Sequence, residues 1–304
     1  MLLRIGLELA DRIVAALPSG AAYALADLVG DAWRRLAPDR RSLVAANLAR
    51  VCEATGRPSH GRAFDALVRS AFRHHARYYV ELLRAPHYDP KRIDEVVRVE
   101  DWPAHEATLR AGPSMLVSSH LGNFEPFGVF LAAHGFRPLA PVEEIEPRVL
   151  FEFLAARRGG RGVELVRLAA SRRALLDRLR SGGLVGIIGD RDITGSGEAV
   201  TIFGHPTTIP NGPAMLALAT GASITVGRCL RVGPDRFQAS GELLGHEPSG
   251  HRRDDVAALT RRVAARFEGD IAAAPEQWWG AFQQFWPDLG RPGETSATIG
   301  ADQI

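Results

Sequence analysis

The chain of 304 residues contains little lysine and little cysteine. Lys91 is the single lysine, and arginine supplies the rest of the basic charge. Cys52 and Cys229 lie far apart and have no metal-like spacing, which argues against a disulfide framework and against a zinc site. No histidines have the spacing of a metal-ligand pair either, so we expect no metal and a reducing compartment.

Long apolar segments are also missing. We expect no signal peptide in the first residues, because Glu8, Asp11 and Arg12 interrupt the apolar stretch early. Residues 199–227 carry no Asp, Glu, Lys or Arg, but prolines and glycines interrupt them repeatedly. This pattern predicts strand, turn and short helix in a folded core and argues against a membrane span.

Charge is nearly balanced over the whole chain but unevenly distributed along it. The 37 basic and 35 acidic residues give a net charge of +2, yet Trp33–Arg84 holds eleven arginines against four acids. Within this segment Arg69, Arg73 and Arg77 recur every four residues and form a basic stripe on a predicted helix. Such a stripe is usually a solvated face, but the basic block favours contact with phosphate groups or an anionic membrane. No groove-reading motif or aromatic platform accompanies it, so we expect no nucleic-acid partner.

From about residue 95, short apolar runs alternate with helical patterns. Strands are expected at 96–99, 114–118, 162–166, 184–188, 200–203, 223–229 and 237–243. Helices are expected near 123–134, 146–158, 171–180, 213–220 and 253–268. The alternation predicts an α/β fold, with a central mixed β-sheet flanked by helices and preceded by an amino-terminal helical portion.

That helical portion begins with Met1–Leu17, an amphipathic pattern that ends before Pro18. Two further helical regions follow at about 20–55 and 60–85. Taken alone, the first helix is better explained by packing on the domain than by a position at a bilayer surface. We expect one domain over 1–289, made of a helical, membrane-facing portion (1–90) and an α/β core (95–289). The tail 290–304 is rich in Gly, Ser and Thr and is predicted to be disordered.

The most informative stretch, Ser118-Ser119-His120-Leu121-Gly122-Asn123-Phe124-Glu125, joins a predicted strand to a predicted helix. Inside one helix, His120 and Glu125 would point about 140° apart, so they can meet only if His120 lies on the turn before the helix. There the Glu125 carboxylate would accept a hydrogen bond from one imidazole nitrogen and make the other more basic. The backbone N–H groups of Gly122 and Asn123 are candidates to stabilise an oxyanion. A helix start with an incidental His and Glu is the alternative explanation.

His120–Glu125 resembles the His-(four residues)-Asp/Glu signature of the lysophospholipid acyltransferase superfamily. The form is that of the lipid A biosynthesis (lauroyl/myristoyl) acyltransferases and the actinobacterial phosphatidylinositol mannoside acyltransferases. Further blocks resemble this family in the same order along the chain. They are Pro141–Glu144 with Arg157–Glu164, then Gly189–Asp192 with Ile202–Gly204 and Pro210–Ala214, and finally Ala274–Trp279. The matches span about residues 70–288, which is much more specific than one short motif.

The resemblance implies transfer of an acyl chain from acyl-CoA or acyl carrier protein to a hydroxyl of a membrane glycolipid, with no cofactor. His120 would be the general base, Glu125 would orient it, and Glu198 would be a further acid of the site. Direct attack by the hydroxyl fits a sequence with no Gly-x-Ser-x-Gly elbow and no Cys placed beside a His.

Four more residues are expected to contact substrate. Arg158 matches a family arginine suited to phosphate, although Arg157 could equally hold this role. Glu143 matches a family acid at the mouth of the cleft, with Glu144 directly beside it. Asn123 and Arg191 complete the expected set.

The acceptor we favour is phosphatidylinositol mannoside, because Asp190-Arg191-Asp192 and the arginine bias are closer to the actinobacterial form. Lipid A and a lysophospholipid are the alternative acceptors, and a non-catalytic lipid-binding protein is the alternative from another class. The mannoside branch commonly has Asp at the position of Glu125, so the first motif does not by itself favour that acceptor. We expect a peripheral protein at the cytoplasmic face of the plasma membrane, held by Met1–Leu17 and Trp33–Arg84.

Overall fold

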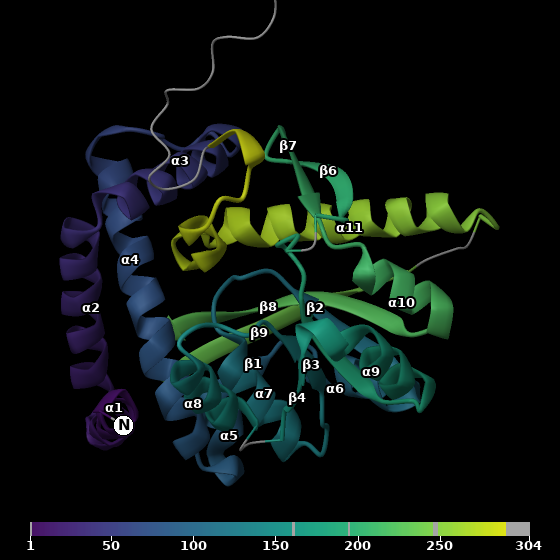
Figure 1. The fold of residues 1–304 in the computed structure, drawn as a ribbon, viewed down its shortest axis with the longest axis horizontal. Helices are drawn as coiled ribbons and strands as arrows, with labels where there is room; N and C mark the ends of the chain where they lie inside the picture. The colour runs from purple at the N-terminus through teal and green to yellow at the C-terminus, as the bar shows by residue number, and fades with distance from the viewer. Residues whose placement is uncertain (1, 160–161, 194, 246–248, 290–304) are drawn as a thin grey trace, which may run out of the picture.

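The computed structural model describes residues 2–159, 162–193, 195–245 and 249–289. It shows a seven-stranded sheet with helices on both faces and a group of amino-terminal helices at one side (Figure 1). The strand order is β1-β9-β8-β2-β5-β3-β4. Strand β9 is antiparallel to β8, and the other neighbouring pairs are parallel. This confirms the predicted α/β fold with a mixed central sheet.

Each strand that the sequence predicts is present, and two more were not expected. The strands are β1 (Val97–Val99), β2 (Ser114–Ser118), β3 (Leu139–Val142), β4 (Glu164–Arg167), β5 (Leu184–Ile188), β6 (Glu198–Ile202), β7 (His205–Ile209), β8 (Ser223–Gly233) and β9 (Arg236–Leu244). The unexpected ones are β3 and β7. Strands β6 and β7 form a separate antiparallel hairpin, joined by Phe203 and Gly204, which both have positive φ as a tight hairpin turn requires.

The core helices cover both faces of the sheet. On one face lie α9 (Leu168–Arg180), α10 (Gly212–Thr220) and α11 (Arg252–Ala273); on the other lie α5 (Ile93–Val96), α6 (Trp102–Ala111) and α7 (Phe124–Ala133). Side chains of β2 alternate between the two layers. Met115 and Val117 belong to the main core with Phe267 of α11, while Leu116 packs near Leu109 and Phe127.

Four helices form the amino-terminal portion: α1 (Leu2–Ala16), α2 (Ser19–Leu36), α3 (Pro38–Ala54) and α4 (Gly61–Arg84). The single helical region predicted over 20–55 is therefore two helices. Ala37 between them has an extended φ of −121° and a ψ of 74°. The reason is Pro38, which lacks an N–H donor and disfavours helical backbone at the residue before it.

The arginine stripe of α4 faces α2. Arg69 Nε and Arg73 Nη2 donate to the carboxylate of Asp31, each at 2.7 Å. Arg77 Nε donates to Asp27 at 2.6 Å. Hydrogen bonds from the two guanidinium groups hold the pKa of Asp31 well below its usual range. This corrects the expectation that the stripe contacts phosphate, because its charges are used to pack α4 against α2.

The last described segment runs from α11 back across the sheet to the amino-terminal helices. It contains the short helices η3 (Pro275–Gln277), η4 (Trp279–Phe282) and η5 (Pro287–Leu289). Asn47 of α3 donates to the carbonyl oxygen of Ala281 at 2.8 Å. No helix among the described residues is both long and apolar enough to cross a bilayer. The tail predicted at 290–304 lies outside the described residues.

Candidate active site

The site forms where parallel strands end side by side. In the register of β2 and β5, Ser118 pairs with Ile188. Two residues further along each strand are His120 and Asp190, so the register itself brings these two side chains together. The carboxyl ends of parallel strands are the usual location of ligand sites in α/β folds.

His120 and Asp190 are in direct contact. The imidazole Nδ1 lies 2.5 Å from Asp190 Oδ1, and the His120 backbone N–H donates to Oδ2 at 2.9 Å. Burial would raise the pKa of Asp190, but the charge and hydrogen bonds of His120 and the Trp278 indole outweigh burial and lower it. The Asp190 side chain is 1% exposed, against 18% for His120. An ionised Asp190 fixes the proton on Nδ1 and leaves Nε2 as the basic nitrogen.

Glu125 does not hold the imidazole, contrary to expectation. Its Oε1 accepts hydrogen bonds from Arg158 Nε at 2.7 Å and from the Tyr78 hydroxyl at 3.2 Å. Arg158 Nη2 in turn donates to the Tyr78 oxygen at 3.0 Å. The charge of Glu125 raises the pKa of Arg158 despite the burial that opposes it. The two carboxylates of the site are thus divided, with Asp190 on the imidazole and Glu125 on the arginine.

The backbone of the His120 turn is tied to other elements. The Gly122 N–H donates to Gln277 O at 3.0 Å, and the Asn123 N–H donates to Cys229 O at 2.8 Å. Both groups are therefore occupied, which corrects their expected role as oxyanion donors. The N–H groups of Trp279 and Gly280 donate to His120 O at 2.9 and 3.2 Å.

Gly122 allows this close packing. Its φ is +66°, and a Cβ placed on it would lie 2.1 Å from Cys229 O. Only glycine combines that backbone conformation with such an approach. The turn is therefore fixed by β8 and by the carboxyl-terminal segment as well as by its own sequence.

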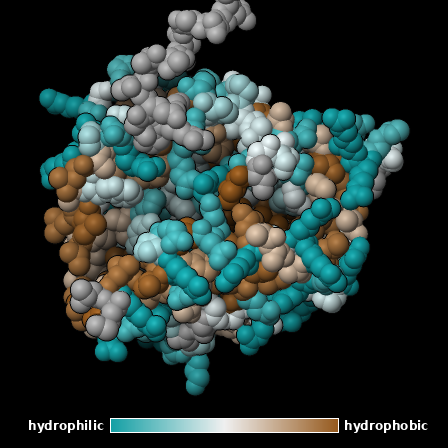
Figure 2. All heavy atoms as spheres, in the orientation of Figure 1, coloured by the Kyte–Doolittle hydropathy of each residue, from teal (hydrophilic) through white to brown (hydrophobic). Residues whose placement is uncertain are grey.

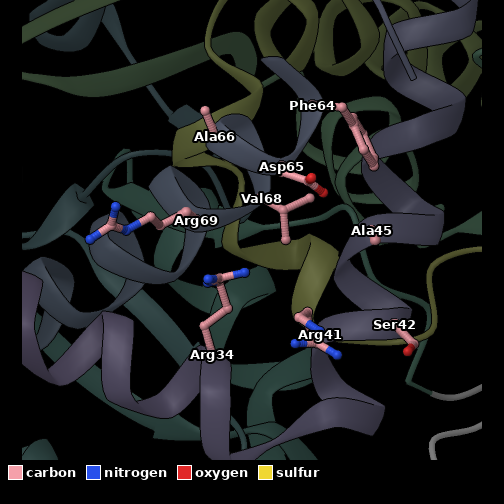
Figure 3. A pocket seen from close by; sticks show the side chains of 9 residues that line it. All are labelled: Arg34, Arg41, Ser42, Ala45, Phe64, Asp65, Ala66, Val68 and Arg69. Carbon is pink, nitrogen blue, oxygen red and sulfur yellow. The ribbon is translucent and has the colours of Figure 1, made fainter. Parts of the chain in front are cut away.

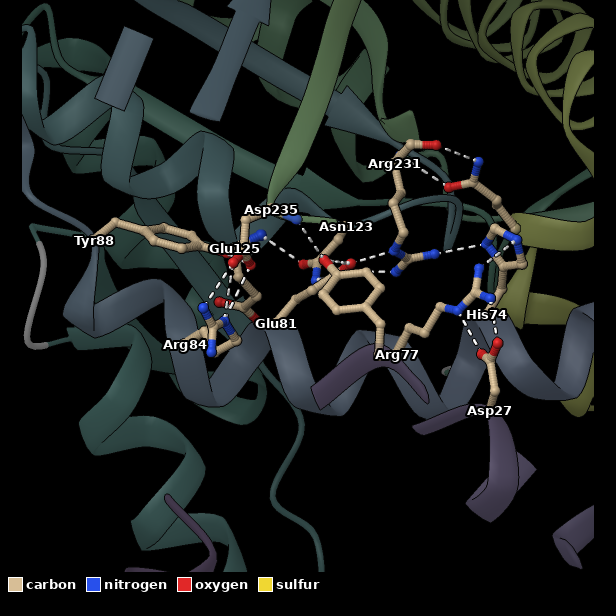
Figure 4. A network of polar contacts seen from close by, with 12 residues as sticks. Asp27, His74, Arg77, Glu81, Arg84, Tyr88, Asn123, Glu125, Arg231 and Asp235 are labelled. Carbon is tan, nitrogen blue, oxygen red and sulfur yellow. Dashed lines mark hydrogen bonds and ion pairs between the residues drawn. The ribbon is translucent and has the colours of Figure 1, made fainter. Parts of the chain in front are cut away.

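The Asn123 side chain makes structural hydrogen bonds and does not face the cleft. Its side chain is fully buried, accepts from the Glu125 N–H at 3.0 Å and donates to Glu81 at 2.8 Å. Glu81 of α4 also accepts from Tyr23 at 2.6 Å and pairs with Arg231 of β8 (Figure 4). The expected substrate contact through the Asn123 side chain is thus corrected: Asn123 caps α7 and connects the turn to α4.

A cleft of about 450 Å³ opens beside His120. At one part of its wall lie Glu143 and Arg191, whose Oε2 and Nη1 are 3.0 Å apart. Both follow strand ends, β3 and β5 respectively, so these two predicted residues are brought to the same cleft as His120 and Arg158. The wall also contains an apolar region made by Trp102, Leu109, Leu116, Phe127 and Leu131.

The other predicted acid and the two neighbouring alternatives lie elsewhere. Glu198 is the first residue of β6 and is not among the described residues that line the cleft. Arg157 donates to Asp11 of α1 at 2.8 Å, and Glu144 lies 3.4 Å from Arg167. Because their neighbours pair outside the cleft, Arg158 and Glu143 are the better placed of each pair. No cluster of three or more His, Cys, Asp or Glu suited to a metal ion occurs among the described residues.

Comparisons with known proteins identify the family of the chain. The model of the bacterial lipid A biosynthesis acyltransferase family matches residues 7–286. The chain belongs to this family. Its resemblance to the family is thereby confirmed, and the chain is an acyltransferase.

Three named relatives are similar to this chain over most of its length. A phosphatidylinositol mannoside acyltransferase of Mycolicibacterium smegmatis is 32% identical over 257 residues, which are 80% of this chain and 79% of the relative. Proteins of the same name from two Mycobacterium tuberculosis strains are 30% identical over 233 residues, which are 74% of this chain and 72% of the relatives.

Asp190 is the site residue that sequence reasoning missed. The available signal was positional, because Asp190 follows its predicted strand at the same distance as His120 follows its own. Turning that signal into a contact requires knowing that β2 and β5 are neighbours in register, which the sequence pattern does not state.

Proposed function

We propose that this acyltransferase moves an acyl chain from a thioester, acyl-CoA or acyl carrier protein, to a hydroxyl of phosphatidylinositol mannoside, without a cofactor. The observation that carries the catalytic part is the His120–Asp190 pair at the wall of the cleft. The acceptor rests on the names of the relatives, which are about 30% identical over most of the chain.

The chemistry needs one base and one acyl thioester. His120 Nε2 removes the proton of the acceptor hydroxyl as its oxygen attacks the thioester carbonyl. Asp190 stabilises the imidazolium that forms, because it already accepts the Nδ1 hydrogen bond. The tetrahedral intermediate then expels the thiolate, which takes the proton from Nε2, and leaves the new ester.

Arg158 is suited to hold a phosphate of the donor or the acceptor. Glu125 and Tyr78 occupy Nε and Nη2, whereas Nη1 has no partner among the described residues. The hydrogen bonds of these two nitrogens orient the guanidinium plane, and a phosphate oxygen could accept a hydrogen bond from Nη1. Glu125 acts here as a positioning residue.

The apolar part of the cleft wall is suited to the acyl chain. Burying each CH₂ group contributes about 0.8 kcal/mol, so a fatty chain gains most by leaving water there. The polar groups Glu143 and Arg191 lie on another part of the wall. This separation favours an acyl chain along the apolar part and the polar head of a substrate at the other.

Association with a membrane surface is supported by the outward faces of α1 and α2. Figure 2 shows hydrophobic side chains gathered over these helices at the left of the molecule. The large exposed ones are Leu3, Ile5, Leu9 and Ile13 of α1 and Leu25, Leu28, Val29 and Leu36 of α2. The same helices turn acids inward, such as the buried Asp11 and Asp31. Apolar faces of this size mark membrane or protein contacts, and we place the protein peripherally at the cytoplasmic face.

The decisive experiment identifies the product. The purified protein is incubated with labelled acyl-CoA and one acceptor at a time: phosphatidylinositol mannoside, lipid A or a lysophospholipid. The lipids of each reaction are then analysed by mass spectrometry. We expect one new acyl ester on the mannoside and none with H120A, whose circular dichroism should match that of the wild type. Acylation of another lipid would overturn the acceptor, and near-normal activity of H120A would overturn the mechanism. Binding of lipid without turnover by the wild type would favour a lipid-binding protein.

A further inference from the structure

A second cavity, of about 680 Å³, lies between α2, α3 and α4 (Figure 3). Arginines from all three helices line it: Arg34, Arg41 and Arg69. Asp65 is the one acid among the described residues that line it. Figure 3 shows the guanidinium group of Arg34 pointing toward Val68 and the middle of the cavity, while that of Arg69 points to one side.

The arginines of this cavity differ in their partners. Arg69 is neutralised by Asp31, as the rest of the α4 stripe is by its own acids. The side chains of Arg34 and Arg41 have no ion pair or hydrogen bond among the described residues. In addition, Arg34 Nε is buried without an acceptor in the described part of the chain. A buried N–H without an acceptor is costly, so its retention calls for an anion or a water molecule at this place.

This cavity is separate from the acyl-transfer cleft. In the described part of the chain no residue lines both, although α4 contributes to each. Val68 lines the arginine cavity and Tyr78 lines the cleft. Ten helical residues correspond to about 15 Å along the axis, so one small anion cannot contact both sites.

The surroundings indicate which kind of anion is offered to the cavity. Leu36 is 82% exposed and belongs to the apolar face of α2, as does Leu28 at 68%. Arg34 lies about 200° around the helix from Leu36, on the opposite side of α2. A surface helix whose apolar face enters a bilayer holds its polar side at the level of the lipid headgroups. Guanidinium groups bind phosphate oxygens through paired N–H donors.

We propose that Arg34 and Arg41 form a binding site for the phosphate of an anionic lipid headgroup, apart from the substrate cleft. The site orients the protein on the membrane by holding a lipid that is not acylated. This inference rests on the membrane association proposed above. General charge attraction would depend on all surface arginines alike, whereas this site requires that Arg34 and Arg41 in particular carry the preference for anionic lipid.

The test compares two pairs of arginines with the same loss of charge. R34Q/R41Q removes the cavity pair, and R35Q/R62Q removes two exposed arginines of the same helical portion that do not line it. Co-sedimentation is measured without acyl-CoA, on vesicles of phosphatidylcholine alone and with one-fifth phosphatidylinositol. We expect the preference for phosphatidylinositol to fall about tenfold in the cavity pair and by no more than about threefold in the control. Equal losses in both pairs would overturn the site.

A second arm distinguishes the lipid from free phosphate. Thermal unfolding is followed in inorganic phosphate and in chloride at equal ionic strength, since a ligand of the folded state raises the melting temperature. Phosphate should stabilise the wild type and the control pair but not R34Q/R41Q. Stabilisation by phosphate without any preference for phosphatidylinositol vesicles would overturn the lipid assignment in favour of a soluble phosphate. Wild-type protein that neither phosphate nor phosphatidylinositol affects would overturn the site itself.

A charge-preserving variant covers the case in which the glutamine pair does not fold. R34K/R41K keeps both charges but replaces the planar fork by point donors. We expect it to lose part of the preference at unchanged net charge; full retention of the preference would overturn recognition by the arginine fork. Because vesicle binding is measured without turnover, a protein that binds as expected but acylates nothing would contradict the proposed function alone.

Discussion

At the scale of single residues, the site has two carboxylates with separate partners. Asp190 contacts the imidazole that acts as base, and Glu125 contacts the arginine that is placed for phosphate. A carboxylate on the base stabilises charge that develops only in the transition state, so it acts on kcat. A carboxylate on a binding arginine acts on affinity for the substrate, so it acts on KM.

Two isosteric variants should separate these effects. D190N should lower kcat by about 10²- to 10⁴-fold with little change in KM, because a neutral partner stabilises imidazolium poorly. E125Q should raise KM for the phosphate-bearing substrate by about tenfold and change kcat less. Steady-state kinetics of acyl transfer measure both. E198Q is the matched control, since Glu198 lies outside the cleft, and should keep wild-type values. The opposite pattern, with kcat lost in E125Q and retained in D190N, would contradict this division.

A buried histidine beside the site predicts how stability depends on pH. His75 packs against Phe282 with ring centroids 4.3 Å apart. Burial, with smaller effects from the charges of Arg40 and His120, lowers the pKa of His75 from 6.5 to about 3. The folded state therefore keeps His75 neutral while the unfolded chain takes up a proton. The resulting stabilisation is complete above pH 6.5 and is lost as the pH falls toward 3.

H75F should remove this contribution. Between about pH 6 and pH 4, H75F takes up one proton fewer on unfolding than the wild type does. The slope of its unfolding free energy against pH should therefore be shallower than that of the wild type by about 1.4 kcal/mol per pH unit. Urea unfolding at several pH values measures the slope for the wild type and for H75F. Identical slopes would show that His75 is protonated equally in the folded and unfolded states.

At the scale of elements, a buried ion pair joins α4 to β8. Glu81 is fully buried and Arg231 nearly so, and Asn123 connects the same carboxylate to the His120 turn. Removing one member of a buried pair leaves a charge without compensation, whereas replacing both often costs little. The contacts of Glu81 therefore fix the position of the His120 turn relative to α4, the helix that supplies Tyr78 to the cleft.

E81Q should destabilise the protein by about 3 kcal/mol, because it leaves the Arg231 charge buried and unpaired. It also replaces one of the two oxygens that accept from Tyr23 and Asn123 by an NH₂ donor. E81Q/R231M should recover part of that loss. Urea unfolding of E81Q, R231M and the double variant gives the coupling free energy. Strictly additive losses would show that the pair is not coupled.

The elements themselves were largely predictable from local patterns, and the misses have physical reasons. Strand β3 contains Pro141, and β7 contains Pro206, residues that lower strand propensity. Strand β7 lies in a two-stranded hairpin, where proline is tolerated, and β3 pairs with β5 at Leu139, two residues before Pro141. The break at Ala37 was missed although Pro38 signals it, because the apolar periodicity of the two helices continues across the proline.

At the scale of the whole molecule, the amino-terminal helices have their ionic faces inward and apolar faces outward. L28S should therefore reduce binding to lipid vesicles about tenfold, since Leu28 is 68% exposed on α2 and would leave water at the membrane. L243S is the control, because Leu243 of β9 is also exposed, at 51%, but lies away from α1 and α2. Vesicle co-sedimentation measures both variants. Equal loss in the two would show that no particular face contacts the membrane.

The candidate site was predictable only in part, because the sequence pattern does not say which elements pack against one another. His120, Glu143, Arg158 and Arg191 were found from motif resemblance, and each lies at the cleft. The pairing of His120 with Asp190 depends on strand order, and the use of the arginine stripe depends on how α2 and α4 pack. Neither follows from local periodicity, since a sequence pattern fixes which face a residue lies on but not which element meets that face.

The hydrogen bonds from Trp279 and Gly280 to His120 have a consequence for the order of synthesis. His120 leaves the ribosome about 160 residues before these partners do. Until Gly280 has emerged, the nascent chain holds the base, its carboxylate and the cleft helices without the contacts that fix the turn. The turn that carries the base can therefore gain all of its contacts only after the chain has been synthesised as far as Gly280.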